Sequence, residues 1–220
     1  VMREMVEVQK IAYQKQYENR VRLLIKCPDQ PGIVAEVATF LYRCGANIVE
    51  SSQYTSNPNG GMFFLRMEFE LPNLQREFRQ LDSNFNSIAV KFSMDYSFSY
   101  VSQLKKVAIF VSKETHCLLE LLWEYQSGDL MMDIPLVISN HEEARGIVES
   151  LDIPFYYIPA NKSIRKQVEQ QQIKLLKEYK VDVIVLARYM QILTDDFVSQ
   201  FPNQIINIHH SFLPAFIGAR

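Results

Sequence analysis

Residues 106–112 read Lys-Val-Ala-Ile-Phe-Val-Ser, a nearly continuous apolar run. A run without polar alternation is typical of a strand that is buried on both faces of a parallel sheet. The same pattern continues along the chain, with predicted strands at 134–139, 154–158, 181–186 and 204–209 and predicted helices at 116–127, 141–150, 163–179 and 195–200. Because strands that alternate with helices indicate βαβ units, residues 105–220 are predicted to form a doubly wound, mostly parallel α/β domain.

The amino-terminal half has a different pattern. Apolar side chains alternate in residues 20–27, a breaker-rich Pro-Asp-Gln-Pro-Gly follows at 28–32, and apolar residues then recur at helical spacing. The predicted elements are a strand at 20–27, a helix at 33–44, strands at 47–56 and 62–71, a helix at 72–84 and a strand at 89–96. This βαββαβ order is that of a ferredoxin-like unit.

The chain is therefore predicted to hold two domains and two shorter segments. Residues 1–19 are a helical or disordered arm, 20–98 the ferredoxin-like domain, 99–104 a polar linker and 105–220 the α/β domain. We expect this last domain to continue beyond Arg220, because the final predicted strand is followed by a loop without a covering helix.

Composition excludes several classes of protein. The 220 residues are 48% hydrophobic and 22% charged, which argues against a mainly disordered chain. The formal net charge of -2 gives no basic field for nucleic acid or an anionic membrane, and no run of about 18 apolar residues predicts a membrane span. Three scattered cysteines without a CxxC pair argue against a disulfide framework and fit a cytoplasmic protein.

Asn207 and His209 are the candidate catalytic residues. They lie two residues apart at the end of the last predicted strand, so both side chains project to one face. Ligands of open α/β sheets bind at the carboxyl ends of the strands. An Asn amide there can stabilise a developing oxyanion, and a His can transfer protons near pH 7. The alternative is that both side chains make structural hydrogen bonds at a strand end.

No metal site is predicted. His209 and His210 are adjacent, but alternation turns His210 to the other face, and no third ligand accompanies them in the sequence. Asp195 and Asp196 are read as residues that favour a helix amino terminus, because they follow Thr194 at the start of a predicted helix.

Two motifs of the second domain are similar to those of folate-dependent formyl-group enzymes. Residues 207–214, Asn-Ile-His-His-Ser-Phe-Leu-Pro, look like the signature of that family, and residues 186–193, Leu-Ala-Arg-Tyr-Met-Gln-Ile-Leu, are similar to its pterin-lining segment. In the first domain, residues 27–33 and 45–48 (Cys-Pro-Asp-Gln-Pro-Gly-Ile and Gly-Ala-Asn-Ile) resemble an ACT domain, a small-molecule regulatory module. The combination, over about residues 20–220, resembles the formyltetrahydrofolate deformylases.

The resemblance implies an activity and a catalytic set. The expected reaction is hydrolysis of 10-formyltetrahydrofolate to tetrahydrofolate and formate, without a metal or other cofactor. Asn207 and His209 would act on the formyl carbon with an attacking water. An Asp that orients the His completes the set in the family; because residues 201–220 contain no acidic side chain, we expect this Asp beyond Arg220.

The resemblance also assigns a folate pocket. The residues that would pack the pterin ring, or hydrogen-bond its edge through backbone groups, are Leu186, Met190, Gln191, Leu193, Phe197 and Val198. The alternative for the apolar members is plain hydrophobic core. The roles of His116 and Arg188 stay open.

The loop after the first predicted strand of the second domain indicates which molecule accepts the formyl group. Relatives that formylate glycinamide ribonucleotide have a Gly-rich loop here, whose N–H groups cradle the phosphate. Residues 111–118 contain no glycine, and Glu114 would repel a phosphate, so water is the expected acceptor. A transformylase with an amine acceptor is the nearest alternative; a catalytically silent folate or amino-acid sensor is an alternative of another class.

The ACT-like domain implies an effector site. Asp29, Gly32, Ile33 and Asn47 would line it between two copies of the domain, which implies a homo-oligomer, dimer or tetramer, and an amino acid as effector. The alternative is that Asp29 and Gly32 serve only the turn and the helix cap.

Overall fold

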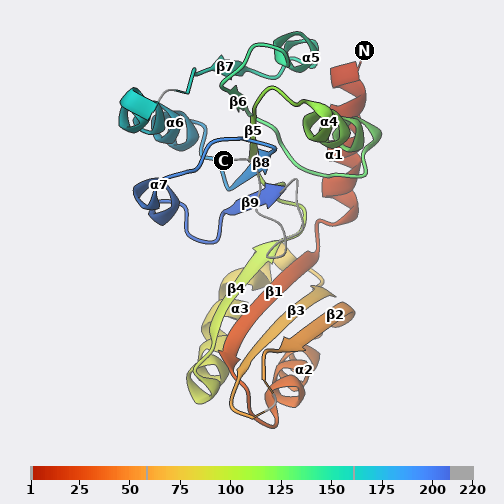
Figure 1. The fold of residues 1–220 in the computed structure, drawn as a ribbon. Helices are drawn as coiled ribbons and strands as arrows, with labels where there is room; N and C mark the ends of the chain where they lie inside the picture. Colours follow the sequence, from red (N-terminus) through yellow and green to blue (C-terminus); the bar gives the residue numbers. More distant parts are fainter. Residues whose placement is uncertain (1, 58, 161, 209–220) are drawn as a thin grey trace. The chain divides into compact units, whose positions relative to one another are not determined.

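The computed structural model describes residues 2–57, 59–160 and 162–208 (Figure 1). The chain divides into two compact units, one of Ile11–Gln103 and one that joins Val1–Lys10 to Leu104–Arg220. Helix α1 (Met2–Gln16) contributes residues to both units. Among the described residues, no helix is long and apolar enough to cross a membrane.

The unit of residues 11–103 is an antiparallel sheet with two helices (Figure 1). The strands lie in the order β2-β3-β1-β4. The bounds are β1 (Arg20–Pro28), α2 (Ile33–Arg43), β2 (Asn47–Thr55), β3 (Met62–Glu70), α3 (Leu74–Phe92) and β4 (Asp95–Tyr100). Alternate residues of β1, such as Leu23 and Ile25, share one core with both helices. This βαββαβ arrangement confirms the predicted ferredoxin-like fold.

The second helix of this unit is longer than predicted. The sequence predicted a helix at 72–84 and a strand at 89–96, but α3 continues to Phe92 and β4 begins only at Asp95. Helical periodicity continues through the missed part, because Phe85, Ala89 and Phe92 are all buried. The helix ends where Ser93 adopts the left-handed conformation, with φ 52°.

The second unit contains a wholly parallel sheet in the order β7-β6-β5-β8-β9 (Figure 1). The bounds are β5 (Val107–Val111), α4 (His116–Ser127), β6 (Val137–Ser139), α5 (Arg145–Glu149), β7 (Phe155–Tyr157), η1 (Lys162–Ile164), α6 (Arg165–Glu178), β8 (Val183–Ala187), α7 (Asp195–Ser199) and β9 (Ile205–Ile208). The helix predicted at 141–150 is thus confined to five residues. The predicted doubly wound fold is confirmed.

The central strand β5 is buried on both faces because helices cover both. Its odd-numbered residues, such as Ile109, pack in one core with α4 and α5. Its even-numbered residues, such as Phe110, pack in a second core with α6 and α7. All five residues of β5 are buried, which explains the unbroken apolar run.

The order of the strands creates a switch point between β5 and β8. The chain moves from β5 to β6 and β7 on one side of the sheet and then returns to add β8 and β9 on the other. In open α/β sheets, ligands bind in the crevice outside the carboxyl ends of the strands at such a point.

Candidate active site

Three strands end at the same level beside the switch point. Val111, at the end of β5, is in register with Ala187, at the end of β8. Ala187 is in turn in register with Ile208, at the end of β9. The segments that follow these strands therefore leave the sheet together, at its carboxyl edge.

Asn207 lies at this edge. It is the third residue of β9, in register with Leu186 of β8, and its side chain is exposed. Alternation along the strand places it on the face of Ile205, which packs against the core of α6 and α7. Its amide is thus available to a ligand at the carboxyl edge. His209 and His210 lie outside the described residues.

The segment after β8 crosses the carboxyl edge between the sheet and α7. It begins at Arg188, whose φ of 54° turns the chain sharply out of the strand. Tyr189 is buried and packs edge-to-face on Phe110, with ring centroids 5.3 Å apart. The backbone N–H of Met190 donates to the Ser112 hydroxyl at 2.9 Å, which ties this segment to the end of β5.

Helix α7 begins directly after this segment. The Thr194 hydroxyl accepts a hydrogen bond from the backbone N–H of Phe197 at 3.2 Å, which caps the helix. Asp195 and Asp196 occupy the first turn, as predicted, where negative charge favours the helix dipole. Phe197 is fully buried between Phe110 and other core side chains and fixes the helix on the sheet.

The six residues assigned to a folate pocket lie on consecutive elements but differ in exposure. Leu186 and Phe197 are 7% and 0% exposed and form part of the core. Met190 and Val198 are 39% and 46% exposed, so their surfaces are open to a ligand. Gln191 is exposed, and Leu193 is half-buried.

Arg188 and His116 come together across the switch point. The Arg188 guanidinium Nη1 lies 3.3 Å from Nε2 of His116, the first residue of α4. The Arg188 Nε is buried without a partner among the described residues. The sequence offered no signal for this pair, because its members are 72 residues apart.

Sequence reasoning also missed the residues that support the segment after β8. Ser112, Glu169 and Gln172 all hydrogen-bond to it, and all three are buried. Burial raises the pKa of Tyr189, the partner of Gln172, so its hydroxyl stays neutral. Within the described part of the chain, no group of three or more His, Cys, Asp or Glu residues could hold a metal ion.

The four candidate effector residues fall at opposite ends of the other sheet. Asp29 and Gly32 follow β1, and Gly32 has a φ of 93° just before α2. Ile33 is 2% exposed and belongs to the core. Asn47 begins β2 and pairs with Glu70, at the far end of β3. Since β3 spans about 26 Å at the usual rise per residue, one copy does not bring Asn47 to Asp29.

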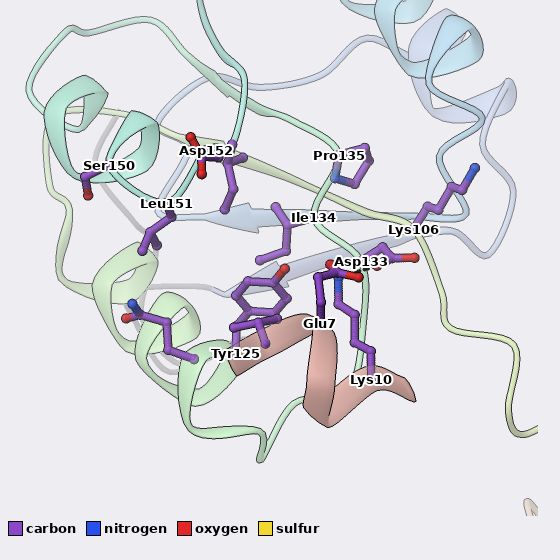
Figure 2. A pocket seen from close by; sticks show the side chains of 13 residues that line it. Glu7, Lys10, Lys106, Tyr125, Asp133, Ile134, Pro135, Ser150, Leu151 and Asp152 are labelled. Carbon is purple, nitrogen blue, oxygen red and sulfur yellow. Dashed lines mark hydrogen bonds and ion pairs between the residues drawn. The ribbon is translucent and has the colours of Figure 1, made fainter. Parts of the chain in front are cut away.

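A cavity of about 580 Å³ is lined by residues that come just before β5, β6 and β7, such as Lys106, Pro135 and Ile153 (Figure 2). It therefore lies at the amino-terminal edge of the sheet, opposite the edge that carries Asn207. Lys10 of α1 is 9% exposed there and donates to Asp133 at 2.6 Å and Glu7 at 3.2 Å. Burial alone would lower the pKa of Lys10, but hydrogen bonds to Asp133 and Tyr125 outweigh it and raise the pKa. These contacts dock α1 on the unit, so we assign this cavity a structural role.

Both halves of the chain match known families. Residues 105–220 match the family described as formyl transferase, and residues 21–83 match the ACT domain.

Curated relatives match over most of the chain. The formyltetrahydrofolate deformylase of Bacillus subtilis is 61% identical over 207 residues, which cover 94% of this chain and 69% of that protein. The formyltetrahydrofolate deformylase of Synechocystis is 45% identical over 197 residues, 90% of this chain and 69% of that protein.

Solved structures of formyltetrahydrofolate deformylases are similar to this chain over most of its length. A formyltetrahydrofolate deformylase from Pseudomonas syringae superposes with a TM-score of 0.83 at 40% identity, covering 96% of this chain and 72% of that one. The corresponding structure from Burkholderia mallei gives a TM-score of 0.82 at 33% identity, with 91% and 70% covered.

Proposed function

The chain belongs to the formyltetrahydrofolate deformylase family, and from this premise we propose how its residues hydrolyse 10-formyltetrahydrofolate to tetrahydrofolate and formate. The fold that carries the reaction is the parallel-sheet unit, and its carboxyl edge at the switch point is the proposed active site. The observation that supports this choice best is the exposed Asn207, the last residue but one of β9, in register with Leu186, the last residue but one of β8.

Asn207 and His209 are the proposed catalytic residues. A water attacks the formyl carbon, and the side-chain N–H of Asn207 donates to the oxyanion that forms on the formyl oxygen. His209 takes a proton from the attacking water and then passes it to the departing nitrogen of the folate as the carbon–nitrogen bond breaks. The formic acid that is released loses its own proton to solvent. Formate and tetrahydrofolate are the products, and no step in this scheme calls for a metal or other cofactor.

The segment after β8 is the proposed folate site. The exposed surfaces of Met190 and Val198 would contact the pterin ring, and backbone groups of Gln191 and Leu193 would bind its edge. Leu186 and Phe197, which belong to the core, would support the site from below.

Water is the proposed acceptor. The segment between β5 and α4 contains no glycine, and Thr115 precedes α4 without a side-chain cap. A phosphate-bearing amine would meet Glu114 in place of a ring of backbone N–H groups. This argues against a transformylase that uses such an acceptor.

Formate release without an added acceptor is the expected result of incubating the full-length protein with 10-formyltetrahydrofolate. Formate is measured by a coupled formate dehydrogenase assay, and tetrahydrofolate by its absorbance. Glycinamide ribonucleotide is added in a parallel reaction. Formyl transfer to that amine without formate release would favour the transformylase, whereas binding of the folate without turnover would favour a silent sensor.

We further propose that the ACT unit binds a small amino acid between two copies of the chain. Backbone N–H groups after Gly32 at the start of α2 would take the carboxylate, and Asp29 would take the ammonium group. Asn47 lies too far along the sheet to join Asp29 within one copy, so it would come from a second copy. This proposal implies that the protein is a homo-oligomer.

A free amino acid is expected to bind this site below about millimolar concentration and to change the hydrolysis rate by about 5- to 150-fold. The measurement is isothermal titration calorimetry and formate release across a panel of amino acids, with Asp29→Asn as the test variant. Asp82→Asn, in α3 of the same unit, is the matched control. If no amino acid binds and none alters the rate, the unit serves assembly only.

A further inference from the structure

Helix α6 carries a row of three polar side chains, of which two are buried in the interior of its unit and one, Arg165, is exposed. Arg165, Glu169 and Gln172 occupy positions i, i+4 and i+7, which lie on one face of a helix. Glu169 is 8% exposed and Gln172 only 1%. Because burying a polar group is costly unless it is hydrogen-bonded, the partners of these side chains indicate what the row does.

Each of the three side chains contacts the segment of residues 188–194 that follows β8, and Arg165 also lies 3.8 Å from the Glu169 carboxylate. One carboxylate oxygen of Glu169 accepts from the backbone N–H of Thr194 at 2.9 Å, and the other accepts from the Thr194 hydroxyl. The side-chain amide of Gln172 donates to the Tyr189 hydroxyl at 2.9 Å. The Arg165 guanidinium donates to the backbone carbonyl of Ile192.

A fourth residue, Ser112, holds the same segment from the side of β5. There the Ser112 hydroxyl accepts from the backbone N–H of Met190. The anchored backbone groups thus belong to residues 190, 192 and 194. Among the described residues, none hydrogen-bonds to the backbone groups of Gln191 or Leu193. Within the described part of the chain, the anchors therefore leave the backbone groups of these two alternate residues unpaired.

Resting on the proposed function, we propose that Arg165, Glu169 and Gln172 are positioning residues that fix the 188–194 segment in the shape that accepts the pterin ring. Glu169 contributes most, because its charged carboxylate accepts two hydrogen bonds at the start of α7. Fixing a binding loop before the ligand arrives saves the ordering cost that binding would otherwise include. The row acts through the loop and does not touch the formyl group.

The test compares Glu169→Ala with Glu178→Ala in the full-length protein. Both changes remove a carboxylate from α6, but Glu178 is exposed and pairs with the exposed Lys174 at 3.8 Å. We expect Glu169→Ala to raise KM for 10-formyltetrahydrofolate and Kd for tetrahydrofolate by about 10- to 100-fold, with little change in kcat. Glu169→Gln keeps an oxygen that can accept from Thr194, so it is expected to restore most of the affinity.

Tyr189→Phe is a milder second variant. It removes only the hydroxyl that Gln172 contacts and keeps the ring on Phe110, so KM is expected to rise by about 2- to 10-fold. This variant tests the positioning role if Glu169→Ala does not fold.

The outcomes separate this proposal from the function beneath it. If the unaltered protein releases formate but Glu169→Ala, or Tyr189→Phe in its place, keeps its KM and its affinity for tetrahydrofolate, the positioning role is wrong. A loss of kcat with an unchanged KM would also overturn it, because it would indicate a role in the chemical step. If the unaltered protein neither binds tetrahydrofolate nor releases formate, the proposed function is wrong, and the positioning role that rests on it is wrong as well.

Discussion

Replacing Asn207 or His209 with alanine is expected to reduce formate release from 10-formyltetrahydrofolate by about 10²- to 10³-fold, the usual cost of losing one oxyanion donor or general acid. For Asn207 the loss is expected in kcat more than in KM, because its amide meets a negative charge that exists only after water has attacked. The fold is expected to survive, since Asn207 is exposed and carries no core packing. The measurement is steady-state kinetics of each purified variant beside thermal unfolding.

His210→Ala is the matched control for this experiment. It removes the same side chain one residue further along, where alternation predicts that the ring faces away from Asn207. We expect its turnover to stay within a few-fold of the unaltered protein. Near-normal formate release by Asn207→Ala or His209→Ala would show that the chemistry lies elsewhere. A loss in His210→Ala as large as that in His209→Ala would mean that the alternation argument assigns the wrong ring.

The parallel sheet could be predicted because its signal is local. All five residues of β5 and most of β8 are buried, so neither strand has a polar face, and the alternating helices require parallel connections. The order of the strands was not predicted from the sequence; the structure shows it and places the switch point between β5 and β8. The sequence alone likewise predicts that Asn207 lies near the carboxyl end of a parallel strand.

The support of the site could not be predicted, because its contacts are not local. Met190 lies 78 residues from Ser112, and Thr194 lies 25 residues from Glu169. In the sequence, Glu169 and Gln172 look like ordinary surface residues of a polar helix. Only packing of α6 against the core makes them buried and turns them toward the 188–194 segment.

The length of α3 was predicted wrongly for a different reason. Residues around 89–96 fit both the two-residue period of a strand and the 3.6-residue period of a helix. Val90, Phe92, Met94 and Tyr96 are apolar at every second position, which favours a strand. Helical spacing selects Phe85, Ala89 and Phe92 instead. The tertiary core decided between them: Val90 is 71% exposed, whereas Phe85 is fully buried.

The contrast between the buried Phe85 and the exposed Val90 leads to the second prediction with a large expected effect, which concerns stability. Phe85→Ala is expected to lower the free energy of unfolding of the 11–103 unit by about 3–5 kcal/mol, the usual cost of truncating a buried Phe. The ring lies 5.2 Å from Phe40, 4.8 Å from Tyr96 and 5.4 Å from Phe98, centroid to centroid, all edge-to-face. It therefore joins α2, α3 and β4 through one side chain, and no small shift of the backbone can fill the space it leaves.

Val90→Ala is the control that makes the result decisive, because a strand at 89–96 would bury Val90 and leave no need for Phe85 in a helix. With α3 as observed, Val90→Ala is expected to change the free energy of unfolding by no more than about 0.5 kcal/mol, since the side chain is exposed. Urea unfolding followed by circular dichroism measures both variants, and hydrogen exchange of β1 peptides assigns the loss to this unit. If Val90→Ala costs more than Phe85→Ala, the alternating pattern describes the segment and the helix does not. The opposite order would mean that this segment packs as a helix, with Phe85 buried and Val90 exposed, and that the alternating pattern of residues 90–96 does not describe it.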